Sequence, residues 1–152
     1  MPIAPVQQKI RHFLLALVIV GAAGLLPELL LLEHYESVWQ YVPLVILTAV
    51  LVASVFVWAR PDPRSMLAFR AVMGLCVVAA LAGLVLHGKG NVEWALERDD
   101  TLRGWPLIWE VLRGATPLLA PGAMAQIGLL GLVYTYRHPA LERGHHLEPE
   151  TK

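Results

Sequence analysis

Four long apolar stretches dominate the 152-residue sequence. A helix rises about 1.5 Å per residue, so roughly 20 residues cross a hydrocarbon core of about 30 Å. Each stretch has about this length, and together they cover residues 13–32, 38–58, 66–86 and 118–136. The sequence therefore predicts an all-α integral membrane protein, a single domain in which four transmembrane helices form a bundle.

The composition agrees with a membrane protein. The chain is 57% hydrophobic and only 16% charged, against about 25% charged residues in soluble domains. The charged residues lie almost entirely between the apolar stretches instead of following helix faces at a 3.6-residue period. The apolar stretches make the lipid bilayer the expected partner. Because the formal net charge is zero, we expect no general electrostatic attraction to nucleic acid.

Basic residues near the predicted membrane ends indicate the orientation of the chain. Some precede the first stretch, some lie in the second connection and others follow the fourth stretch, whereas residues 33–37, the first connection, contain none. These basic residues are Lys9, Arg11, Arg60, Arg64, Arg137, Arg143 and Lys152. Segments rich in lysine and arginine resist translocation. We therefore expect a multi-pass protein of a bacterial cytoplasmic membrane, with both termini and the polar tail, residues 139–152, in the cytoplasm.

The connection between the third and fourth stretches, residues 87–117, is long enough to contain structure of its own. Within it, residues 105–113 carry apolar side chains at positions i, i+3, i+4 and i+7, on one face of a helix. These side chains are Trp105, Ile108, Trp109 and Leu112. We expect a short amphipathic helix at the outer membrane interface, serving as an anchored connector, or alternatively as a lid or docking surface.

Small residues recur at a spacing of three or four inside the apolar stretches, a pattern that lets transmembrane helices approach closely. The predicted packing residues are Gly21 with Gly24, Ala49 with Ala53, Ala79 with Gly83, and Ala125 with Gly128 and Gly131. Most should lie inside the bundle, and one such pair could instead serve a homodimer.

Two polar side chains inside the predicted helices are candidate functional positions, because placing such groups in lipid is costly. Glu28 lies near the outer end of the first stretch. It could bind a proton, pair with Gln126, Arg103 or Arg113, or reach the headgroups. Gln126 lies near the middle of the fourth stretch, where we expect an interhelical hydrogen bond and, as the alternative, a place in a ligand pocket.

Catalytic and metal-binding patterns are absent from the sequence. Cys76 is the sole cysteine, so neither a disulfide within the chain nor a cysteine metal cluster can form. The histidines next to the stretches lie at helix ends, not deep in the bundle where haem ligands belong. No nucleophile–base arrangement or phosphate loop appears. We therefore expect no catalytic residue, no metal, no cofactor and no enzymatic activity.

These observations favour a non-catalytic accessory or assembly subunit of a membrane complex, with a membrane-protein partner or a second copy of itself. The alternative is a small proton-coupled transporter or channel that uses Glu28 as its membrane carboxylate. A carboxylate in the first of four membrane helices resembles the small multidrug-resistance transporters, and this resemblance implies proton-coupled export. The long outer connection and the position of Glu28 near the helix end depart from that family's pattern.

Overall fold

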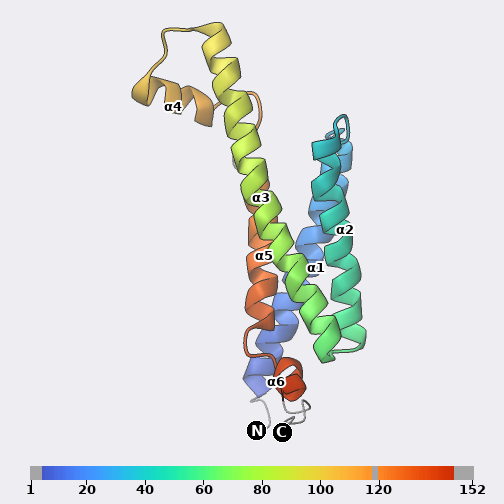
Figure 1. The fold of residues 1–152 in the computed structure, drawn as a ribbon. Helices are drawn as coiled ribbons and strands as arrows, with labels where there is room; N and C mark the ends of the chain where they lie inside the picture. Colours follow the sequence, from blue (N-terminus) through green and yellow to red (C-terminus); the bar gives the residue numbers. More distant parts are fainter. Residues whose placement is uncertain (1–4, 118–119, 146–152) are drawn as a thin grey trace, which may run out of the picture.

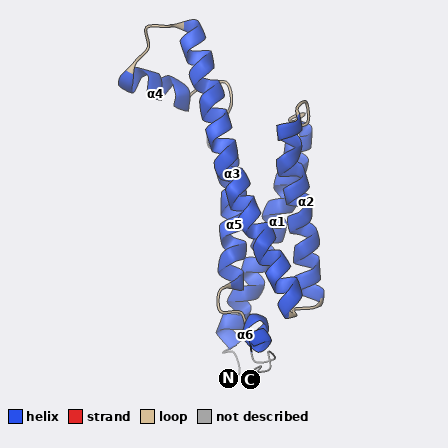
Figure 2. Ribbon diagram, in the orientation of Figure 1, coloured by secondary structure: helices blue, strands red, loops and turns tan. Residues whose placement is uncertain are grey.

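The computed structural model describes residues 5–117 and 120–145, and within them it contains helices joined by turns and no strand. The helices are α1 (Pro5–Leu31), α2 (Val38–Ala59), α3 (Pro63–Arg98), α4 (Gly104–Leu112), α5 (Ala120–Thr135) and α6 (Pro139–His145). Figure 2 shows the helices in blue and the loops and turns in tan. The all-α prediction is confirmed.

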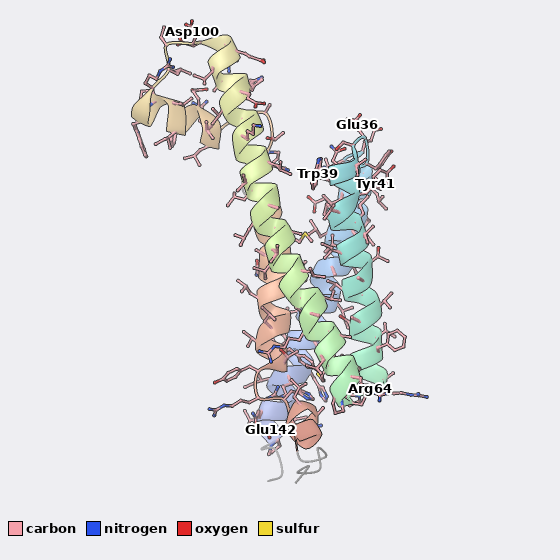
Figure 3. All side chains as sticks on the ribbon, in the orientation of Figure 1. Glu36, Trp39, Tyr41, Arg64, Asp100 and Glu142 are labelled. Carbon is pink, nitrogen blue, oxygen red and sulfur yellow. The ribbon has the colours of Figure 1, made fainter. Side chains whose placement is uncertain are left out.

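Four of these helices pack as a ring. α1 contacts α2 and α5, and α3 also contacts α2 and α5, with α3 against α5 as the most extensive interface. Figure 3 shows Glu36 and Asp100 at one end of the molecule and Arg64 and Glu142 at the other. We call these the outer end and the inner end, following the orientation that the basic residues predict.

Three helices, α1, α2 and α3, are long and apolar enough to cross a membrane, which indicates a multi-pass membrane protein. α5 has 16 residues and therefore reaches only roughly 24 Å. Residues 118 and 119 of the fourth predicted stretch lie outside the described residues. The fourth membrane crossing therefore stays a prediction.

The helix bounds differ from the sequence expectation mainly in α1 and α3. α1 begins well before residue 13, whereas α2 ends within one residue of its predicted end. α3 continues to Arg98, so the first part of the expected outer loop, residues 87–98, is helical. This part contains no proline, and its buried residues Asn91 and Ala95 give the polar extension a packed face. The extension carries the outer end of α3 well beyond the α1–α2 turn (Figure 1).

Two shorter helices complete the described chain. α4 lies where the amphipathic pattern predicted a helix, displaced by one residue. α6 falls in the segment that we expected to be a polar tail and begins at Pro139, a residue suited to a first helical turn. Residues 146–152 of that tail lie outside the described residues.

The turn between α2 and α3 is fixed by a side-chain cap. The Asp62 carboxylate accepts hydrogen bonds from the backbone N–H groups of Arg64 and Ser65, at 2.9 and 3.1 Å. The Ser65 hydroxyl in turn lies 3.2 Å from the Asp62 N–H, which completes a capping box. With Pro63 as the first helical residue, this turn reverses the chain and makes α2 and α3 antiparallel neighbours.

Small residues set the distance between α3 and α5. A Cβ atom on Gly128 would lie only 2.8 Å from the Met73 carbonyl oxygen, and one on Gly131 would overlap the Met73 side chain. Gly21 and Gly83 also face side chains of α5, Ile127 and Pro121, at 3.1 and 3.2 Å from the position of an added Cβ. Other predicted packing residues are partly buried against the core, namely Ala53, Ala79 and Ala125, and Ala49 is likewise partly buried.

Gly24 differs from these packing glycines. A Cβ atom added there would meet nothing within 4 Å, so this glycine touches no neighbouring helix in the described structure. The close contact that we expected at Gly24 is absent, because this residue faces an open groove.

Candidate functional site

The groove beside Gly24 lies between α1 and α5 and has a volume of about 440 Å³. Apolar residues of both helices line most of it, and Gly24 and Ala123 leave room at its surface. On α1 the lining residues recur at a spacing of three and four from Leu17 to Glu28, so they form a single stripe of the helix. The groove therefore runs parallel to the two helices, from Leu17 to Glu28 on α1 and from Ala123 to Leu130 on α5.

Both polar candidates from the sequence line this one groove. Glu28 comes from α1 and Gln126 from α5, and both side chains are exposed. Among the described residues, neither has a hydrogen-bond or ion-pair partner. The interhelical hydrogen bond expected for Gln126 is thus absent from the described residues, because the side chain faces the groove and not the interior of the bundle.

The pairings considered for Glu28 with the outer arginines are not observed either. Arg103 donates hydrogen bonds to the carbonyl oxygens of Asp100 and Leu102, at 2.8 and 2.6 Å. Within the described chain, Glu28 forms no ion pair with Arg113. Among the described residues, no cation therefore pairs with the Glu28 carboxylate in the groove.

Contacts with α3 give the depth of the two groove residues. Cys76, near the middle of the apolar part of α3, donates to the carbonyl oxygen of Met124 over 3.2 Å, so Gln126 lies near mid-depth. Gly21 lies against Ile127, and Glu28 is two helical turns further outward. Glu28 therefore lies level with the start of α5, near the outer end of the apolar region.

A buried arginine joins α1 to α5 at the inner end. The Arg11 guanidinium donates to the carbonyl oxygens of Tyr134, Tyr136 and Arg137, at 2.6, 3.0 and 3.0 Å. Only 8% of Arg11 is exposed. These carbonyls end α5, where a cation is favoured by the helix dipole. From the sequence, Arg11 was expected only to indicate orientation, although its place at the edge of an apolar stretch is also suited to helix capping.

A buried asparagine holds the outer segment in place. Asn91 on α3 donates through Nδ2 to the carbonyl oxygens of Val111 and Thr116, at 3.0 and 2.8 Å. Its Oδ1 accepts from the Thr116 N–H and hydroxyl, at 3.0 and 2.7 Å. This role of Asn91 was not predicted from the sequence, because residues 87–117 were expected to form a loop, in which an asparagine is ordinary.

α4 lies crosswise to α3 near the outer end (Figure 1), in contact with it. Its predicted apolar stripe is not covered by the rest of the described protein. The four side chains are between 47% and 69% exposed, and they are Trp105, Ile108, Trp109 and Leu112. This unpartnered stripe is available to the membrane or to another protein.

Two histidines meet at the outer end. The ring centroids of His34, in the α1–α2 turn, and His87, on α3, lie 6.4 Å apart. His87 donates through Nδ1 to the Pro117 carbonyl oxygen over 3.1 Å. Partial burial, and then the charge of His87, lower the pKa of His34 below its ordinary value, which favours neutral imidazole. Among the described residues, no group of three or more His, Cys, Asp or Glu side chains is arranged to hold a metal.

The groove is an apolar contact surface with two polar side chains, Glu28 and Gln126. Glu28 supplies one ionisable group, and the amide of Gln126 offers two donors and an acceptor. Among the described lining residues, Glu28 is the ionisable one. No family model, no curated protein and no solved structure matches this chain.

Proposed function

We propose that the protein is a non-catalytic accessory or assembly subunit of a membrane complex and that its α1–α5 groove receives a helix of a larger membrane protein. One observation carries this proposal: Gln126 faces outward near mid-depth without a partner among the described residues. At that depth an amide cannot reach the headgroups, and an unpaired polar group in hydrocarbon costs several kcal/mol. A partner helix would cover the groove and supply the missing hydrogen bonds.

The proposed placement has four membrane crossings, α1, α2, α3 and α5. α5 packs along α3 and α1 over its length, so it shares their depth although it is shorter. α4 then lies at the outer membrane interface, since it runs crosswise to the crossings and exposes an apolar stripe. The start of α1 and α6 share the inner end (Figure 1), and the basic residues support a cytoplasmic location for that end. The proposed membrane is the cytoplasmic membrane of a bacterium.

Cysteine labelling tests this orientation. Cysteine at Arg64 or Glu142 should be shielded from a membrane-impermeant maleimide in intact cells, and cysteine at Glu36 or Asp100 should react. All four positions are exposed, and the native Cys76 is buried, so background labelling should be low. Asn91 is unsuitable as an outer probe because it is buried. Labelling of the Glu142 variant in sealed cells would contradict cytoplasmic termini.

Filling the groove tests the proposed function. Gly24→Leu should reduce co-purification of a larger stoichiometric partner in mild detergent by about tenfold, equivalent to about 1.4 kcal/mol. Gly74→Leu, on α3, is the matched control, because an added Cβ meets nothing within 4 Å at either glycine and Gly74 does not line the groove. Equal yields of partner from both variants would refute docking in the groove.

The purified protein can also be tested for the alternative function, proton-coupled transport. Because Glu28 is an ionisable group that lines the groove near its outer end, a proton-coupled transporter or channel is the second candidate. It requires substrate uptake into vesicles that depends on pH and is lost in Glu28→Gln. A homodimer with such uptake would favour transport over the accessory role.

A further inference from the structure

We propose that the helix received by the α1–α5 groove carries a lysine or arginine near its outer end, level with Glu28. This inference rests on the proposed function and specifies the chemistry of the partner at the same groove. The observation behind it is the exposed Glu28 carboxylate, which has no cation partner among the described residues.

The protein's own outer basic residues are largely engaged elsewhere. Lys89 pairs with Glu93 across 3.8 Å, and the Arg98 guanidinium lies 4.5 Å from the centroid of the Trp94 ring. Arg103 caps backbone carbonyl groups of its own loop. A helix seated in the groove would remove water and headgroups from the carboxylate, and a cation on that helix would offset the cost of burying this charge.

A second copy of the chain does not meet this requirement. Two copies that met through the same groove about a two-fold axis along the membrane normal would bring their Glu28 residues to the same depth. Like charges in a contact of low dielectric repel each other strongly. A different helix with a basic residue instead gains a charge-assisted hydrogen bond at this position.

The shape of the groove fits a helix. Between Leu17 and Glu28, α1 advances roughly 16 Å, or three helical turns. Gly24 and Ala123 allow the backbone of a partner to approach closely. Gln126 provides hydrogen-bonding capacity near mid-depth, about two helical turns further inward than Glu28. The partner helix would therefore have polar contacts at two depths.

The test uses the full protein reconstituted in phosphatidylcholine vesicles with a synthetic leucine–alanine helix of about 20 residues. One peptide carries a lysine one turn from its end, and the matched peptides carry leucine or glutamate there. Energy transfer between labelled protein and peptide should show the lysine peptide bound about tenfold more tightly than the leucine peptide, a difference of about 1.4 kcal/mol. Glu28→Gln should bring the two affinities within about twofold, and Glu28→Lys should shift the preference to the glutamate peptide.

The outcomes separate the charge inference from the docking function. Equal binding of the lysine and leucine peptides would overturn the charge inference. If Gly24→Leu also abolishes the binding of both peptides and Gly74→Leu keeps it, the docking groove is supported. Binding of any peptide that Gly24→Leu leaves unchanged counts against the groove itself. Displacement of the lysine peptide by phosphatidylethanolamine, dependent on Glu28, would assign the site to an ammonium lipid and overturn the helix proposal.

Discussion

Arg11→Ala should lower the free energy of unfolding by about 3 kcal/mol, since it deprives three carbonyl groups of a charged donor. The carbonyls belong to Tyr134, Tyr136 and Arg137, at the end of α5. Without Arg11, these carbonyl groups could bond only to water, and Arg11 is almost fully buried at this place. Thermal unfolding in detergent, followed by circular dichroism, measures the loss.

Two further variants give this prediction its controls. Arg11→Lys keeps the charge but replaces a planar fork by a single ammonium, so it should recover only part of the stability. Lys9→Ala removes a neighbouring charge from an exposed position and should melt with the native protein. If Arg11→Ala and Lys9→Ala melt together, the bonds from Arg11 to α5 contribute nothing measurable to the fold.

The sequence was sufficient to predict the elements whose cause is local. The lengths of the apolar stretches gave α2 almost to the residue, and the i, i+3, i+4, i+7 pattern gave α4. The outer end of α3 was not predictable in this way. Residues 87–98 are polar enough to suggest a loop, and their helix is supported by the contacts of Asn91 with Val111 and Thr116, which are distant in the sequence.

The rotation of α5 explains why Gln126 lines the groove and does not face α3. Gly128 and Gly131 pack against α3, and a residue two positions before Gly128 is turned by about 200° around the helix. Gln126 therefore faces away from α3. The small residues favour this side of α5 for burial, because they allow close approach to Met73.

The candidate groove depends on the register of two antiparallel helices. Glu28 and Gln126 were both recognisable as polar residues in apolar surroundings, but their meeting in one groove follows from the contact of Gly21 with Ile127. A shift of α5 by one turn would move Gln126 about 5.4 Å along α1. Sequence spacing within each helix carries no information on that register.

Asn91→Ala should detach α4 and the segment that follows it from α3, with a local loss of about 2–4 kcal/mol for a fully bonded buried amide. The side chain makes two bonds as donor, to Val111 and Thr116, and two as acceptor, both from Thr116. Removing it leaves these backbone groups to water. Hydrogen exchange of the amides of residues 104–116 should accelerate, whereas the exchange of α2 should not change.

An isosteric variant separates the hydrogen bonds from the volume of the side chain. Asn91→Asp keeps the shape and the acceptor for Thr116 but turns the donor atom into an oxygen that faces two carbonyl oxygens. It should therefore release the segment at least as completely as Asn91→Ala, and acidification that protonates the carboxyl group should restore part of the protection. Glu93→Ala, on the exposed side of the same helix, is the control and should leave exchange in α4 unchanged. Native protection of residues 104–116 in Asn91→Asp at neutral pH would show that packing against Ala95 and its neighbours, and not the amide bonds, holds the outer segment on α3.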